Sequence, residues 1–254
     1  MQLAIAALVL LIAAPGQAQS GRCAACAARS DSAFVAGDGE ASLNFALEGL
    51  RRDSNDLELL WRAARSEIAI GIVSGEERRL IDAHLVRAIE YSRRAVALAP
   101  NEAGPHFWLA AALGRLSLRV GFRRAVPLAS EAYTEASRAL AIDSMQAGAH
   151  EIIGKLHSEV RKLPWLVRRL VASLSNLEVA RHASWEEAEY HLKKSIAIDP
   201  SVVLAWADLS QLYLRTGRRL EAIAVVEALE RRPRLTPADA FLQDQARRRL
   251  GWYR

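Results

Sequence analysis

One spacing recurs along the chain and restricts its fold more than any other feature. The same interval separates a small residue from a bulky one at three places, Ala88 to His106, Ala132 to His150 and Ala188 to Trp206. Such an interval is expected where the second helix of one hairpin meets the first helix of the next at a fixed angle. The small side chain allows close approach, and the bulky one packs above it. The spacing therefore predicts a stack of helical hairpins.

The composition favours helices throughout. Ala, Leu, Arg and Glu, all good helix formers, predominate, and only 14 Gly and 8 Pro interrupt the 254 residues. Long alternating runs of β-branched and aromatic residues, which indicate strands, do not occur. We predict an all-α fold, an α-α superhelix of about four helix pairs.

The distance inside each predicted hairpin varies. From the opening bulky residue to the small residue it is shortest in the last unit, Trp206 to Ala222. It is longer in the units that run from Leu60 to Ala88 and from His106 to Ala132, and longest from His150 to Ala188. We therefore expect insertions between the paired helices of these three units, with the largest in the third.

The last unit resembles a tetratricopeptide repeat. The signature positions of that repeat hold Trp206, Leu209, Ser210, Tyr213, Gly217 and Ala222. Across all units, the positions expected to pack helices together are Ala64, Ala88, His106, Ala110, Ala132, His150, Gly154, Ala188, Trp206, Ser210 and Ala222. His150 and His157 stand where the repeat usually has aromatic residues, so we expect them in the helical core.

The third unit, residues 148–200, resembles the regulator of microtubule dynamics family. The similar features are its Gly- and His-containing first helix, the inserted LPWLVRRLVASL, the SWEEA helix start and the AIDP end. The resemblance extends over about residues 48–230. Proteins of that family are microtubule-associated, or act at organelle contacts and in lipid handling. The resemblance thus implies a groove, and lipid or small-molecule binding or transfer at a membrane surface as one function.

The N-terminus predicts export. Residues 3–14 are apolar, too short a run to span a bilayer, which needs about 20 residues. With Pro15-Gly16-Gln17-Ala18 they fit a signal peptide, residues 1–18, cleaved after Ala18. We predict a periplasmic or extracellular protein; an anchor formed by residues 3–14 is the alternative.

The next segment, residues 19–40, has little helical periodicity and is predicted to be a flexible linker before a helical repeat domain at 41–250. The linker holds Cys23 and Cys26. No His follows them as haem attachment requires, and no βαβ pattern surrounds them as in a thioredoxin. We expect either a disulfide or two free thiols.

The motifs of catalysis and of cofactor binding are incomplete. The segment GAHEIIGKL (148–156) has the wrong spacing for a phosphate loop and lacks its Ser or Thr. The sequence beginning at His150 and Glu151 lacks the second His of a zinc motif, because residue 154 is Gly. We predict no cofactor, no metal and no catalysis; an enzyme would need ionisable side chains that converge in a pocket.

The charge pattern is that of a protein with basic helix faces. The net charge is +5, and the excess of Arg and Lys lies in residues 160–181 and 215–254. Solvated Arg-rich helices account for such a pattern, so no nucleic-acid partner is expected.

The first helices of stacked pairs line the concave side of a superhelix. The residues expected to point into this groove are Trp61, Arg65, Phe107, Glu151, Lys155 and Gln211. Aromatic residues and Arg are typical anchors of binding surfaces. The alternative is that inserted segments cover Trp61 and Phe107 and make them part of the core.

The inserted segment 163–177 is amphipathic and basic, with Trp165 near its start and Arg168 and Arg169 opposite its apolar face. It either packs into the core or lies on an anionic membrane. Taken together, the sequence predicts a non-catalytic scaffold that binds a protein or peptide in its groove. Lipid or small-molecule carriage, with a cavity under residues 163–177, is the alternative.

Overall fold

The computed structural model describes residues 23–73, 78–174, 178–234 and 239–251, and every regular element in these ranges is an α-helix. In chain order they are α1 (Ala24–Val35), α2 (Gly39–Leu50), α3 (Leu57–Val73), α4 (Arg78–Leu98), α5 (Ala103–Ser117), α6 (Phe122–Ile142), α7 (Ala147–Lys162), α8 (Trp165–Leu174), α9 (Val179–His182), α10 (Trp185–Ile198), α11 (Val203–Arg215), α12 (Arg219–Glu230) and α13 (Asp239–Gly251). The all-α prediction is confirmed. The predicted signal peptide, residues 1–18, lies outside the described residues.

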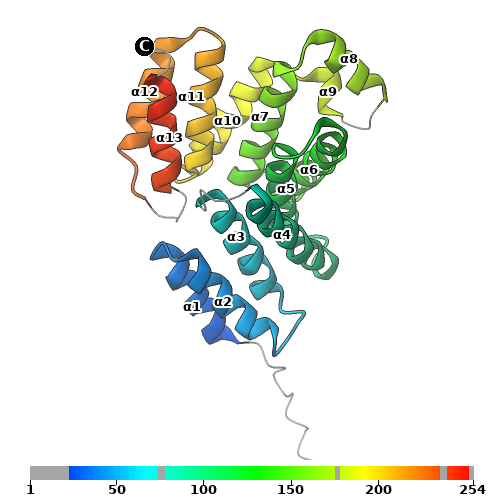
Figure 1. Cartoon of the computed structure of the whole chain (residues 1–254), viewed down its shortest axis with the longest axis vertical. Helices are drawn as coiled ribbons and strands as arrows, with labels where there is room; N and C mark the ends of the chain where they lie inside the picture. The colour runs from blue at the N-terminus through cyan, green and yellow to red at the C-terminus, as the bar shows by residue number, and fades with distance from the viewer. Residues whose placement is uncertain (1–22, 74–77, 175–177, 235–238, 252–254) are drawn as a thin grey trace, which may run out of the picture.

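The helices pack in pairs that form a curved stack (Figure 1). The pairs are α1–α2, α3–α4, α5–α6, α7–α10 and α11–α12, and each also packs on the next. Helix α13 packs on α11 and α12 and ends the described stack. Four of these pairs are the ones that the sequence predicts, and α1–α2 is an additional one.

The curvature brings distant parts of the chain together. Ile72, near the end of α3, packs against the apolar cluster that α11, α12 and α13 form around Val203, Ala207 and Leu242. It also packs on the central cluster of α4 to α7. An early pair and the last pair of the superhelix therefore meet across its concave side.

The predicted packing residues lie where helices approach closely. All of the predicted packing residues are buried except Trp206, which is half-buried. A Cβ atom on Gly154 would lie 3.0 Å from the backbone oxygen of Ala188 and 2.8 Å from Leu192 Cγ, so α7 and α10 can approach only because residue 154 has no side chain.

The bulky residues that open α5, α7 and α11 share one hydrogen bond. A ring N–H of His106, His150 and Trp206 donates to the carbonyl oxygen of Pro100, Ser144 and Pro200, at 2.9, 3.2 and 3.0 Å respectively. In the α3 unit the equivalent residue is Leu60, and Arg94 donates to the corresponding carbonyl instead. Histidine can therefore replace tryptophan here because both rings carry an N–H at the required reach.

The two histidine rings make a second hydrogen bond each. His106 Nδ1 bonds to Glu135 and His150 Nδ1 to His191, both on the second helix of their own pair, so these rings also join the two helices of one pair. The recurring interval in the sequence reflects the regular length of helix, turn and helix.

The extra residues of the earlier units are accommodated in two ways. Ala222 lies in the first turn of α12, whereas Ala88 and Ala132 lie near the middle of α4 and α6. The first two units thus carry most of their extra residues as longer second helices of 21 residues each. Among the described residues, the α7–α10 unit alone has separate inserted helices, α8 and α9.

The prediction of a flexible linker over residues 19–40 is wrong for its described part. Helix α1 buries Cys26, Ser30 and Phe34, and α2 begins at Gly39 after the N-cap Asp38. The buried hydroxyls of Ser30, Ser42 and Ser66 form a chain of hydrogen bonds between α1, α2 and α3. Small residues produce weak periodicity in the sequence, yet they are what closely packed helices require.

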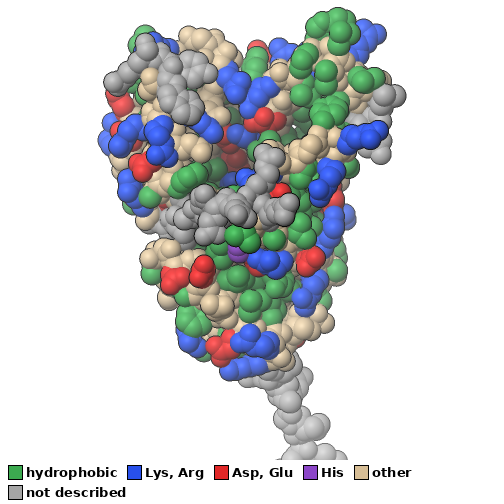
Figure 2. Space-filling model, viewed as in Figure 1, with side chains coloured by type: hydrophobic (Ala, Val, Ile, Leu, Met, Phe, Trp, Pro, Cys, Tyr) green, Lys and Arg blue, Asp and Glu red, His purple; other side chains and the backbone are tan. Residues whose placement is uncertain are grey.

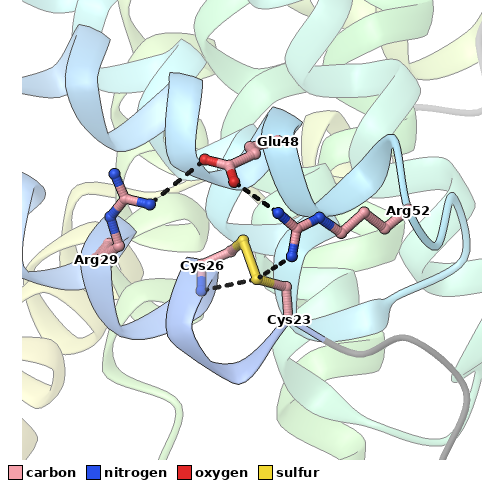
Figure 3. The surroundings of a disulfide bond; sticks show 5 residues. All are labelled: Cys23, Cys26, Arg29, Glu48 and Arg52. Carbon is pink, nitrogen blue, oxygen red and sulfur yellow. Dashed lines mark hydrogen bonds and ion pairs between the residues drawn. A yellow bond between two sulfur atoms is a disulfide. The ribbon is translucent and has the colours of Figure 1, made fainter.

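The two cysteines form a disulfide at the start of α1 (Figure 3). Cys26 is buried among apolar residues of α2 and α3, and the Cys23 sulfur lies 3.6 Å from Nη1 of Arg52. Glu48 joins Arg52 to Arg29 through ion pairs of 2.9 and 3.5 Å. Of the two states expected from the sequence, the structure has the disulfide.

Candidate functional site

A cavity of about 570 Å³ opens on the concave side of the stack. Its lining comes from α1, α3, α5, α7, α11 and α13, which are the first helices of the pairs together with the final helix. The face drawn in Figure 2 is hollowed between α7 and α11, and charged side chains are visible in the hollow. The volume lies in the usual range of about 300–1,000 Å³ for ligand pockets.

Five of the six predicted groove residues line this cavity. They are Arg65, Phe107, Glu151, Lys155 and Gln211. Trp61 does not; its ring stacks parallel to that of Trp108, with centroids 6.2 Å apart, and the Arg62 guanidinium lies 4.1 Å from the centre of the Trp61 ring. Phe107 thus faces the cavity, as the groove prediction requires, whereas Trp61 only stacks on Trp108, a residue of the cavity wall.

Phe107 owes its position to a glycine. A Cβ atom on Gly148 would lie 2.2 Å from the Phe107 ring, so only Gly allows the ring to lie against α7. The rest of the apolar wall comes from several helices and includes Ile68, Ile72, Trp108, Ile152, Leu204 and Leu242.

Arg65 is oriented by the segment that was predicted to be a linker. Its guanidinium bonds to Asp31 of α1 at 2.8 Å and lies 4.0 Å from the centre of the Phe34 ring. Burial alone would raise the pKa of Asp31, but hydrogen bonds from Arg62 and Arg65 bring it below its usual value. Helix α1 is therefore part of the site.

A cluster of charged residues forms another wall of the cavity. Lys155 of α7 pairs with Asp208 of α11, and also lies 3.4 Å from Glu159. Although burial opposes it, Asp208 raises the pKa of Lys155 above its usual value. Burial, and next the nearby Asp208, raises the pKa of Glu151 to about 8, so Glu151 carries a proton at neutral pH.

Arg115 of α5 completes this cluster. It lines the cavity, burial lowers its pKa, and the negative charge of Asp208 attracts it. Arg115 and Asp208 were not predicted from the sequence, because the first lies two turns beyond the groove positions used and the second contacts a different pair. Lys155 of α7 and Asp208 of α11 occupy different repeat positions, so the repeat pattern gave no signal for their pairing.

Four histidines lie together where α7, α9 and α10 meet. His150 and His157 of α7 meet His191 of α10, with 2.8 Å between the Nδ1 atoms of His150 and His191, and the ring centre of His157 is 5.5 Å from that of His182. His150 donates from Nε2 to a carbonyl oxygen, so its Nδ1 accepts from His191. Burial lowers the pKa of His157 and of His191 to about 4.

The expectation that His150 and His157 are core residues agrees with their exposed fractions of 6% and 2%. Within the described ranges, no three His, Cys, Asp or Glu side chains are arranged to hold a metal ion. The charged cluster is nevertheless a converging set of ionisable side chains, which was not expected from the sequence.

The inserted helix α8 has two apolar faces. Val167 and Val171 pack against α6, α7 and α9, as core packing requires. Trp165, Leu166 and Leu170 are 61, 61 and 55% exposed, and hydrophobic side chains gather where α8 lies in Figure 2. None of the α8 residues lines the 570 Å³ cavity, so this is not the cavity that lipid carriage would place under residues 163–177. In the described part of the chain, no helix is both long and apolar enough to cross a membrane.

Comparison with known proteins identifies the family. The family model described as Regulator of microtubule dynamics protein 1-3 matches residues 27–253. The chain belongs to this family. The match begins within α1, in agreement with the finding that this helix is part of the repeat domain.

Curated relatives carry the same family name. Regulator of microtubule dynamics protein 1 of Bos taurus is 25% identical over 153 residues, which are 59% of this chain and 47% of the bovine protein. The protein of that name from Mus musculus is 24% identical over 200 residues, 77% of this chain and 64% of the mouse protein. The chain thus spans about half to two thirds of the length of these relatives.

A solved structure has the same fold. A thermophilic tetratricopeptide-repeat protein of Thermus thermophilus superposes on 89% of this chain and 97% of its own, with a TM-score of 0.61 and 22% sequence identity. The predicted superhelix of tetratricopeptide-type helix pairs is therefore confirmed.

Proposed function

We propose that this protein is a non-catalytic scaffold that binds a segment of a protein partner in its concave cavity. The observation that carries the proposal is the convergence of the first helices on one cavity with an apolar wall and several oriented charges. Binding pockets generally combine a mainly apolar lining with a few placed polar groups. The family's repeat fold supports an interaction role as well.

Selection from a displayed random peptide library, followed by calorimetric titration of the selected peptides, tests this function. Ala111→Phe fills the cavity without changing charge, and Lys155→Glu reverses a charge in its wall. Both are expected to abolish binding. Arg219→Glu in α12 and Arg231→Glu at its C-terminal cap, both at exposed positions, are matched controls that leave binding unchanged. Selected peptides that bind all four variants equally would contradict the proposal.

We also propose that the chain is exported and loses residues 1–18. The disulfide between Cys23 and Cys26 supports this, because disulfides persist mainly in oxidising compartments. Mass spectrometry of the N-terminal peptide from the exported fraction is expected to begin at Gln19. A peptide that begins at Met1 and is recovered with membranes would instead indicate an uncleaved anchor.

A second candidate function is contact with an anionic membrane through α8. Its support is the exposed apolar face of Trp165, Leu166 and Leu170, with Arg169 exposed between them and no acidic residue in the helix. A Trp, Leu and Arg face of this kind suits the interface of an anionic bilayer.

Co-sedimentation with vesicles of phosphatidylcholine alone, or of phosphatidylcholine and phosphatidylserine in equal amounts, tests the membrane contact. We expect sedimentation only with phosphatidylserine, and its loss in Trp165→Ser/Leu170→Ser. Leu220→Ser, at an 80% exposed position of α12, is the control. Equal sedimentation of the α8 variant and the control variant would exclude this role for α8.

A further inference from the structure

Arg115 differs from the cations of the cavity that the repeat pattern predicts. Arg65 is paired with Asp31, and Lys155 with Asp208. Arg115 is half-buried and lines the cavity, yet within the described residues its guanidinium makes no hydrogen bond and no ion pair. With Glu151 protonated at neutral pH, Asp208 attracts the Arg115 guanidinium only through space. The five N–H donors of the guanidinium are therefore available to an acceptor that enters the cavity.

The neighbouring carboxyls do not neutralise it. Asp208 is already bonded to Lys155. Burial, and next the charge of Asp208, raises the pKa of Glu151 and keeps its carboxyl protonated at neutral pH. Glu159 is shared by Lys155 and Lys162. The three cations Arg115, Lys155 and Lys162 therefore face the two anions Asp208 and Glu159, and one positive charge is left uncompensated while Glu151 is neutral. That charge faces a cavity whose other walls are mainly apolar.

We propose that Arg115 binds a carboxylate of the partner, with an adjoining apolar group of the partner on the wall formed by Ile68, Ile72 and Leu242. This rests on the proposed function and specifies it: the bound segment presents an Asp or Glu side chain, or a free C-terminus, beside a large apolar side chain. A planar guanidinium matches a carboxylate through two parallel hydrogen bonds. A single uncompensated charge suits a carboxylate better than a phosphate dianion.

The small probe is 4-phenylbutyrate, an apolar ring with one carboxylate, compared with the neutral 4-phenylbutyramide. Affinities are measured by calorimetric titration of the full chain at pH 7. We expect the carboxylate to bind about 10- to 100-fold more tightly than the amide, the range that a charge-assisted pair supplies. In Arg115→Met, the affinity for 4-phenylbutyrate is expected to fall to the affinity for 4-phenylbutyramide. Arg138→Met, on the exposed side of α6, is the control.

The protonation of Glu151 supplies an independent readout. Above pH 8 its carboxylate forms and competes for Arg115, so the affinity for 4-phenylbutyrate is expected to fall between pH 7 and pH 9. In Glu151→Gln the affinity should stay constant over that range. Equal binding of acid and amide, or full binding by Arg115→Met, would overturn the proposal.

A peptide array separates this inference from the function on which it rests. Each array peptide is made once with Asp or Glu and once with Asn or Gln. Preference for the acidic member supports both statements, and binding without such preference overturns the inference but leaves the scaffold function. Binding of dodecanoate without any peptide supports a carboxylate at Arg115 and overturns the peptide-binding function.

Discussion

The pairs α7–α10 and α11–α12 carry different side chains at equivalent repeat positions. In α11 the opening residue is Trp206, followed by Ser210 and Tyr213; in α7 the same positions hold His150, Gly154 and His157. Both opening residues close the preceding turn with a ring N–H to a carbonyl. The shared requirement is thus a flat ring with a donor, rather than an apolar one.

The difference lies in how tightly each pair closes and in what it buries. Gly154 lets α7 and α10 approach more closely than a side chain would allow. The α7–α10 pair also holds the histidine cluster, whereas Tyr213 of α11 bonds to Glu189 at 3.0 Å. The α7–α10 pair therefore depends on close packing and neutral histidines, whereas α11–α12 has a core of Leu, Val and Ala with one buried Tyr.

The largest expected effect is obtained by exchanging the residues at the small position. Gly154→Ser should destabilise the protein by about 3 kcal/mol, because the new side chain overlaps Leu192 and the Ala188 backbone oxygen. The reciprocal Ser210→Gly should cost about 1 kcal/mol through lower helix propensity and a lost hydrogen bond. Urea unfolding measures both. Similar costs for the two variants would show that the pairs are packed alike.

Acid should weaken α7–α10 selectively. The pKa of His157 and of His191 is about 4 in the folded protein, against about 6.5 in the unfolded chain. Between these values the unfolded state binds more protons, so stability present above pH 6.5 is lost as pH falls toward 4. After allowance for solvent screening, we expect the free energy of unfolding to fall by about 2 kcal/mol over this pH range.

Hydrogen exchange at pH 7.5 and 4.5, corrected for intrinsic rates, locates this loss. Protection should fall in α7 and α10 and stay in α11 and α12. His157→Phe, which keeps a ring but cannot take a proton, should retain more of the protection at pH 4.5. An equal fall in both pairs would mean that the histidines are not its cause.

The smallest effect concerns the hydrogen bond from the ring N–H of the opening residue to the carbonyl oxygen of the preceding turn. His150→Phe should cost about 1–2 kcal/mol, because it also leaves His191 without its partner. Trp206→Phe should cost less than about 1 kcal/mol, since the bond to Pro200 is exposed. Thermal unfolding of both variants ranks them, and the reverse order would contradict the view that α7–α10 carries the more interdependent contacts.

Much of the site followed from the repeat pattern, and the part that did not has a common cause. Arg65, Phe107, Glu151, Lys155 and Gln211 were found because each occupies a fixed position after an opening residue. Arg115, Asp208 and Asp31 were missed because their roles come from contacts between different pairs, or from a helix whose small residues gave no clear period.

The sequence by itself determined the helices, the positions that pack them and the family, because these depend on contacts repeated between neighbours. Only the tertiary structure decided that Ile72 reaches the cluster of α11 and α13 and that the groove becomes a cavity. The curvature of such a stack is the sum of small rotations at every pair. No single segment of sequence encodes that sum, so the convergence of Arg65, Arg115, Lys155 and Asp208 appears only in the folded molecule.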